Sequence, residues 1–239
     1  MTEQTDKPKP RRRWLQYSLR TFFVLLTVLC VWLGWTVHRA NEQRKVVEWV
    51  KEMGGTVEYD YQFDKDDVDI DDAEPPGPAW LDQLLGVDYR QEVEGVDLAD
   101  TQANDLTPLA GLKRLEWLAI RGTPLSDLTP LAKLTRLQEL ELEYTQVSDL
   151  TPLAGLNNLR WLNLQNTQVS DLTPLAGLAN LKYLYLNNTQ VSDLAPLAKL
   201  TSLKWLDLYE TPVSEEQVEE LRKALPNCII PWSPPDPSP

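Results

Sequence analysis

The 239-residue sequence has little of the residue types that carry most enzyme chemistry. It contains one histidine, His38, and two cysteines, Cys30 and Cys228, which lie in an apolar segment and near the C-terminus. This spacing predicts neither a disulfide framework nor a Cys/His zinc site. The sequence also lacks a P-loop and a G-x-G-x-x-G motif. Without a Ser/His or Cys/His pair outside the surroundings of His38, we predict that the chain is not an enzyme and uses no cofactor or metal.

Basic residues are scarce in most of the chain. The sequence has 23 Lys and Arg against 36 Asp and Glu, a net charge of −13. Residues 1–40 nevertheless have seven basic and two acidic residues, so the remaining chain carries sixteen against thirty-four. A domain this acidic repels phosphates, which argues against nucleic acid as a partner.

Charge is absent altogether from Thr21–Val37, an apolar run of 17 residues bounded by Arg20 and by His38-Arg39. A membrane-spanning helix needs about 17–25 residues, so the run predicts a transmembrane helix. A cleaved signal peptide is the alternative, but the run is long for one and no Ala-x-Ala follows it. Six basic residues before the run and four after it favour a cytoplasmic N-terminus and an exported C-terminal part.

The regions that flank this run differ in composition. We expect a basic segment at 1–20, the transmembrane helix at 21–37 and a helix-strand stalk unit at 38–63, with the strand at Thr56–Phe63. An acidic, Pro-rich linker at 64–78 follows, in which Asp67, Asp69 and Asp71 match a calcium loop poorly. A repeat domain at 79–230 and a Pro-rich tail at 231–239 complete the chain.

The repeat domain contains five near-copies of a 22-residue segment, which begin at Thr107, Thr129, Thr151, Thr173 and Ala195. This period, with L-x-x-L-x-L at its centre, predicts a leucine-rich repeat solenoid of the α/β class. Alternation points the leucines of each strand inward, and Thr173-Pro174 predicts a short helical turn with Thr as the cap. A degraded repeat at Leu85–Leu106, after a short helix at Pro78–Leu85, and a helix after Ser214 are expected to cap the ends.

The combination L-x-x-L-x-L-x-x-T-x-V-S-D-L-T-P-L-A-x-L resembles the repeats of the internalin family over about Leu85–Ile230. The resemblance implies a parallel β-sheet on the concave side, 3-10 or irregular turns on the convex side, and a protein-binding role. The N-terminal anchor and the Gly54-Gly55 unit resemble membrane-tethered bacterial repeat proteins, which implies a single-pass protein of the inner membrane. The sequence departs from the family where Asn is usual; we expect the threonines there to form a structural ladder (Thr101, Thr123, Thr145, Thr167, Thr189 and Thr211).

The exposed positions before, between and after the strand leucines differ from repeat to repeat, so they are the candidate binding residues. Six are aromatic and three are acidic: Trp117, Trp161, Tyr183, Trp205, Tyr185 and Tyr209, with Glu139, Glu141 and Glu143. Large aromatic rings on one face are typical anchors of interfaces, and the acids would steer a basic group. We therefore predict a protein partner with a basic, partly apolar surface. A glycan ligand, simple stacking of the rings along the sheet, and a spacer without a ligand remain alternatives.

Overall fold

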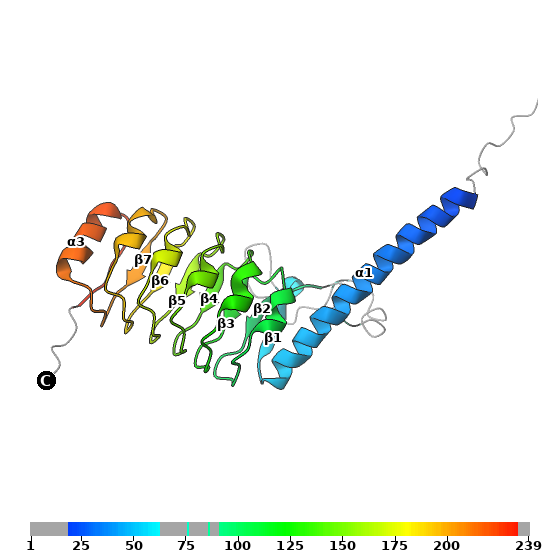
Figure 1. Ribbon diagram of the computed structural model, residues 1–239, viewed down its shortest axis with the longest axis horizontal. Coiled ribbons are helices and arrows are strands. Elements are labelled where there is room, and N and C mark those ends of the chain that lie inside the picture. The colour runs from blue at the N-terminus through cyan, green and yellow to red at the C-terminus, as the bar shows by residue number, and fades with distance from the viewer. Residues whose placement is uncertain (1–18, 63–75, 77–85, 87–90, 234–239) are drawn as a thin grey trace, which may run out of the picture. The chain divides into compact units, whose positions relative to one another are not determined.

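The computed structural model describes residues 19–62, 76, 86 and 91–233 (Figure 1). Four predicted regions lie wholly or almost wholly outside the described residues. They are the basic segment up to residue 18, the acidic linker with its three calcium-loop aspartates, the short helix expected at 78–85, and the tail from 234. The chain divides into two units, residues 1–39 and residues 40–239.

Helix α1 runs without a break from Leu19 to Glu52. Its apolar part exposes side chains such as Phe22, Leu25 and Trp32, and none of its most apolar window is buried. In length and composition the helix fits a membrane span, and an N-terminal signal sequence would fit equally well. The guanidinium of Arg39 lies 5.5 Å from the ring centre of Trp35.

The second unit is a coil of repeats built on one seven-stranded sheet in the order β1 to β7. The strands are β1 (Thr56–Tyr59), β2 (Val93–Asp97), β3 (Trp117–Ala119), β4 (Glu139–Glu141), β5 (Trp161–Asn163), β6 (Tyr183–Tyr185) and β7 (Trp205–Asp207). Strand β1 is antiparallel to β2, and all later pairs are parallel. The strand expected at Thr56–Phe63 therefore ends earlier, at Tyr59, where the 3-10 helix η1 (Asp60–Gln62) follows.

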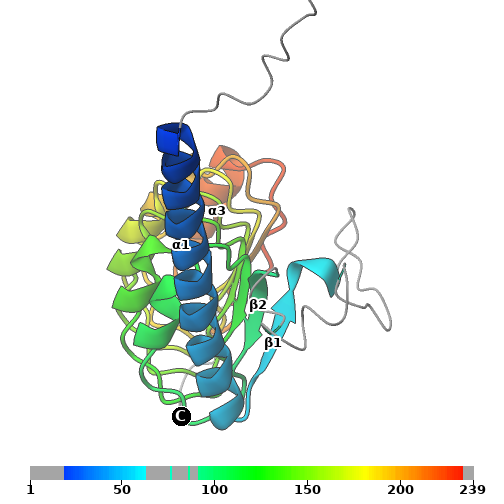
Figure 2. The same ribbon diagram turned by 90° about the vertical axis from the view of Figure 1, so that its right-hand side faces the viewer.

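Five 3-10 helices return the chain from one strand to the next, and Figure 2 shows them on the side of the coil away from the sheet. They are η3 (Thr107–Gly111), η4 (Thr129–Lys133), η5 (Thr151–Leu153), η6 (Thr173–Leu175) and η7 (Ala195–Lys199). The predicted leucine-rich repeat solenoid, with a parallel sheet and 3-10 turns, is confirmed.

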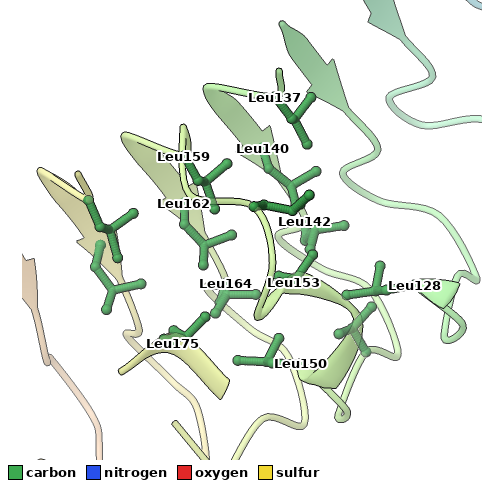
Figure 3. Close-up of a cluster of buried hydrophobic side chains, with 14 of the residues drawn as sticks. Leu128, Leu137, Leu140, Leu142, Leu150, Leu153, Leu159, Leu162, Leu164 and Leu175 are labelled. Carbon is green, nitrogen blue, oxygen red and sulfur yellow. The ribbon is translucent and has the colours of Figure 1, made fainter. Parts of the chain in front are cut away.

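Stacked leucines form the core between the sheet and the turns (Figure 3). Leu140, Leu162 and Leu184 pair in register on neighbouring strands, and all three are fully buried. A three-residue strand cannot bury its side chains alone, so each repeat depends on its neighbours for burial and for backbone partners. Together these contacts make one continuous core instead of separate small ones.

Both ends of this core are covered by helices. Val46, Val47 and Val50 of the C-terminal part of α1 join the core cluster at the first repeat. At the other end, helix α3 (Glu215–Ala224) buries Val218 and Leu221. As the capping box predicts, the Ser214 hydroxyl accepts a hydrogen bond from the Gln217 amide at 3.3 Å. The final segment forms an isolated parallel bridge, Trp205 with Ile229, in place of a full strand.

Aspartate, and not threonine, caps the 3-10 turns. The amide of Thr173 donates to Asp171 Oδ1 at 2.8 Å, while no side chain bonds from Leu172 at the cap position. The prediction of Thr173 as the cap is therefore wrong; the preceding Ser-Asp supplies the acceptor. Hydrogen bonds from the threonine hold the pKa of this aspartate, and of its counterparts Asp105, Asp127 and Asp149, below its usual value.

The threonine column is buried and each hydroxyl closes its own turn. All six threonines are at most 8% exposed. Each Oγ1 donates to the carbonyl three residues earlier at 2.6–2.8 Å, as Thr189 does to Leu186. The bond thus lies within one repeat, where a short side chain reaches, and does not bridge adjacent repeats as a ladder would.

Candidate binding face

Strand register brings the predicted site residues onto the outward side of the sheet, which we call the sheet face. Trp117, Glu139, Trp161, Tyr183 and Trp205 are successive partners across β3 to β7. Ala119, Glu141, Asn163, Tyr185 and Asp207 form a second row in the same way. Since the leucine between the two rows is buried, alternation directs both rows away from the core. Glu143 and Tyr209 follow two residues after the second row.

Three of the aromatic residues on the sheet face, Trp161, Tyr183 and Tyr185, pack against one another. The Trp161 ring centre lies 5.1 Å from Tyr183 and 5.0 Å from Tyr185, both at a tilt of 37°. Tyr183 is 37% and Tyr209 47% exposed, whereas Trp117, Trp161 and Trp205 are only partly exposed. These three rings therefore stack along the sheet, and all the rings of the face remain at least partly exposed to solvent.

The acidic residues lie on β4 and just after it. Glu139 is exposed, and Glu141 and Glu143 are partly buried. Burial, and then the nearby charge of Glu141, raises the pKa of Glu143. Arg121 Nη1 lies 3.9 Å from Glu141 Oε2, at the outer limit of an ion pair. The carboxylates therefore leave this part of the face negative.

A hollow of about 230 Å³ opens on the sheet face beside these acids. Its lining is Asp97, Trp117, Leu118, Ala119, Arg121, Glu139 and Glu141. Ala119 is the shortest side chain in its row and is only 7% exposed, because longer neighbours stand on both sides of it. The residues of this hollow that sequence reasoning left out are Asp97, Ala119 and Arg121. A single alanine among long polar side chains was the available signal.

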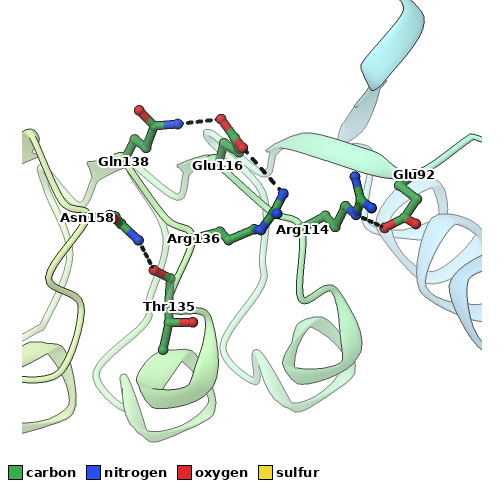
Figure 4. A network of polar contacts seen from close by, with 7 residues as sticks. All are labelled: Glu92, Arg114, Glu116, Thr135, Arg136, Gln138 and Asn158. Carbon is green, nitrogen blue, oxygen red and sulfur yellow. Dashed lines mark hydrogen bonds and ion pairs between the residues drawn. The ribbon is translucent and has the colours of Figure 1, made fainter.

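One rim of the sheet carries a network of polar contacts (Figure 4). Arg114 Nε lies 2.6 Å from Glu92, and Arg136 lies 4.0 Å from Glu116. Gln138 also donates to Glu116, and Asn158 donates to the Thr135 carbonyl at 2.7 Å. These contacts connect residues 20 to 23 apart, so they fix neighbouring repeats to each other.

The same rim position turns basic in the later repeats. Glu116 and Gln138 are followed at the 22-residue period by Arg160, Lys182 and Lys204, all exposed. None of these three has an ion pair within the described part of the chain. Sequence reasoning did not select them, although comparing the same column across repeats would have revealed the change of charge.

Another residue that sequence reasoning missed is Tyr144, which is 66% exposed. Its φ is +57°, the left-handed conformation that disfavours bulky side chains. The equivalent positions are Asp100, Gly122, Asn166, Asn188 and Glu210, also at positive φ. The amide of Tyr144 donates to the Gln165 carbonyl in the next turn at 3.0 Å, and the amides of Asp100, Gly122, Asn166 and Asn188 donate in the same way, so stacking supports this conformation in these repeats. An aromatic side chain among turn-forming residues was the signal.

Metal-binding geometry is absent from the part of the chain that the structure describes: no group of three His, Cys, Asp or Glu there could hold an ion. Burial raises the pKa of the Cys228 thiol to about 11, so this thiol is protonated at neutral pH.

Comparison with known proteins identifies relatives of the repeat domain. The family model "Leucine Rich repeats (2 copies)" matches residues 157–199. Internalin C2 from Listeria monocytogenes is 39% identical over 64% of this chain and 69% of its own, with a TM-score of 0.57. Internalin InlF from the same organism is 32% identical over 56% of this chain and 39% of its own, with a TM-score of 0.53.

A leucine-rich repeat protein of Leptospira interrogans is also similar. It is 30% identical over 54% of this chain and 34% of its own, with a TM-score of 0.51. The chain thus spans 34% of this protein and 39% of InlF, but 69% of internalin C2. No curated protein matches the chain significantly.

Proposed function

The chain belongs to the internalin-like leucine-rich repeat proteins, and on that premise we propose that it is a non-enzymatic, membrane-anchored module. It binds a protein partner through the sheet face, the concave side in this family. The observation that carries this proposal is the register that places Trp117, Trp161, Tyr183 and Trp205 in one row. Rings of this kind, gathered on one face, supply most of the binding energy at protein interfaces.

The partner has a mixed surface. Its basic part faces Glu139, Glu141 and Glu143, which speed and orient its approach. Its apolar part covers the ring cluster, with Tyr185 and Tyr209 beside the central row, and Tyr144 extends the contact area at the far edge. The basic rim residues Arg160, Lys182 and Lys204 call for acidic groups on the partner near the later repeats. A uniformly basic partner is therefore a poorer match than one with both charges.

The anchor is the apolar part of α1, at residues 21–37. The helix-strand unit at 38–63 packs against the first repeat through Val46, Val47 and Val50 and through β1. Residues 64–78 serve as the linker, 79–230 as the binding domain and 231–239 as a tail. The excess of basic residues before the anchor favours a cytoplasmic N-terminus and a binding domain outside the inner membrane. Protease added to intact spheroplasts should then digest the repeats and leave the N-terminal segment; full protection of the repeats would reverse this topology.

Photo-crosslinking tests the binding face directly. A photoreactive residue at exposed position 183 in cells should yield a discrete protein adduct, whereas the same residue at exposed position 168, off the sheet face, should not. The double variant Trp161→Ala/Trp205→Ala should lose the adduct at 183. Because both tryptophans are partly buried, circular dichroism of the variant and the milder Tyr209→Ser substitution, at a residue that is 47% exposed, separate binding from folding. An unchanged adduct in the folded double variant would remove the proposal.

Salt distinguishes the partner class. Adduct formation with a charged protein partner should fall as ionic strength rises from about 0.05 M to 0.5 M, because screening shortens the range of the Glu and Lys charges. Inhibition of crosslinking by soluble envelope oligosaccharides, without a salt effect, would favour the glycan alternative.

A further inference from the structure

We propose that the hollow around Ala119 receives one arginine side chain of the protein partner. This inference rests on the proposed function and names the group that anchors the acidic half of the sheet face. The hollow lies at the Trp117 end of the aromatic row, apart from the packed rings of Trp161, Tyr183 and Tyr185, so it adds a second point of recognition.

Strand order builds the hollow. Asp97, Ala119 and Glu141 are direct partners on β2, β3 and β4. Adjacent strands lie about 4.8 Å apart, so two carboxylates flank the alanine at roughly 10 Å from each other. Trp117 and Glu139 form the neighbouring wall, two residues earlier on β3 and on β4. The volume of about 230 Å³ is many times the roughly 10–15 Å³ that one water molecule needs, so a side-chain end group fits.

Charge selects a cation. Three carboxylates and one guanidinium line the hollow, which leaves it negative by two charges. The one lining cation, Arg121, lies 3.9 Å from Glu141 and its side chain is half exposed, so it neutralises the hollow only in part. The negative charge of the hollow would repel an anionic group, and a neutral group would gain no electrostatic attraction there.

Shape selects arginine over lysine. A guanidinium is planar and donates hydrogen bonds from both edges, so it can face Asp97 on one side and Glu141 on the other. Its flat face can also lie against the indole of Trp117, where a cation is attracted to the ring. The compact ammonium of lysine meets only one carboxylate at a time.

Short capped peptides provide the probe. The full chain in nonionic detergent, with ¹⁵N in its tryptophans, is titrated with acetyl-Ala-Arg-Ala-amide at millimolar concentration. The Trp117 indole resonance, assigned by a Trp117→Phe variant, should shift with saturation. The lysine peptide should shift it less, and the glutamate and leucine peptides should leave it unchanged.

Two variants test the geometry. Ala119→Leu fills the hollow and should abolish the shift, whereas Asn163→Leu places the same leucine side chain in the same row outside the hollow and should retain it. Glu141→Gln, which leaves the space open, should weaken binding up to about fivefold, the range of exposed ion pairs. If Ala119→Leu does not fold, the Glu141→Gln variant still tests the proposal.

The results also separate this inference from the proposed function. A Trp117 shift that persists in Ala119→Leu, or that the glutamate peptide reproduces, overturns the arginine site. If the arginine peptide fails to shift Trp117 while the adduct at position 183 still depends on Trp161 and Trp205, the site is wrong and the binding face stands. If the shift occurs and the adduct does not depend on them, the proposed function fails instead.

Discussion

Tyr144→Asn should stabilise the repeat domain, although it removes an aromatic side chain. Tyr144 has φ +57°, and the asparagines at positions 166 and 188 adopt φ +54° at the same point of their repeats. The left-handed conformation costs an ordinary residue about 1–2 kcal/mol, and asparagine tolerates it better. Because the ring is 66% exposed, its loss removes little buried area. We expect a net gain of about 1 kcal/mol, equal to a rise in Tm of about 2–4 °C for a domain of this size.

The measurement is urea unfolding of the full chain in nonionic detergent, monitored by circular dichroism. A shift of the midpoint with an unchanged m-value reports the change in stability. Tyr144→Phe keeps the steric cost and should not move the midpoint. Glu210→Asn, at φ +55° in the last repeat, should give a gain of similar size. A lower midpoint for Tyr144→Asn would refute the assignment of backbone strain to this turn.

Strain that persists at an exposed aromatic residue suggests that the ring has a use. Under the proposed function, Tyr144→Asn should therefore yield less crosslinked adduct at position 183 while the domain becomes more stable. A gain in stability with a full yield of adduct would confine Tyr144 to a structural role and leave the rest of the sheet face as proposed.

Three further predictions concern buried or hydrogen-bonded polar groups. Thr189→Val should cost about 1–3 kcal/mol, because it leaves the buried carbonyl of Leu186 without its hydroxyl donor; Thr189→Ser, which keeps the bond, should cost less, and equal urea midpoints for Val and wild type would contradict this. Asp149→Asn should lower Tm at pH 7, and the difference should shrink as the pH falls below about 3.9, since the folded-state pKa lies below the unfolded value and the carboxylate stabilises only while ionised; a deficit that does not change with pH would argue against it. Glu143→Gln should raise Tm at pH 7 with no advantage below about pH 4.3, because burial raises the folded-state pKa and ionisation therefore favours unfolding; a loss of Tm at neutral pH would be the opposite result.

Much of the fold was predictable because the same 22-residue pattern occurs five times in the sequence. The leucines of L-x-x-L-x-L all point to the core, and the period alone fixes which residues become neighbours across the sheet. The Ser214 cap was readable for the same local reason. The turns were harder to predict from the sequence. Thr173 taken alone matches the pattern of a cap, but its amide donates to the carboxylate of Asp171, which is therefore the capping group. The strand expected at residues 56–63 ends at Tyr59, because its pairing with β2 stops there. The sequence alone does not reveal where that pairing stops.

The candidate site shows the same division. The sequence determined which residues share a column, since the 22-residue period assigns Trp161, Tyr183 and Trp205 to one position. Only the tertiary structure decided how far those rings are covered, that Ala119 leaves a hollow between its longer neighbours, and that Tyr144 takes a positive φ. The physical reason is that the 22-residue period shows which residues occupy equivalent positions in the repeats. Burial, cavity volume and backbone strain instead arise from contacts and hydrogen bonds between repeats. Those contacts connect residues 22 apart, so they exist only once the coil has stacked.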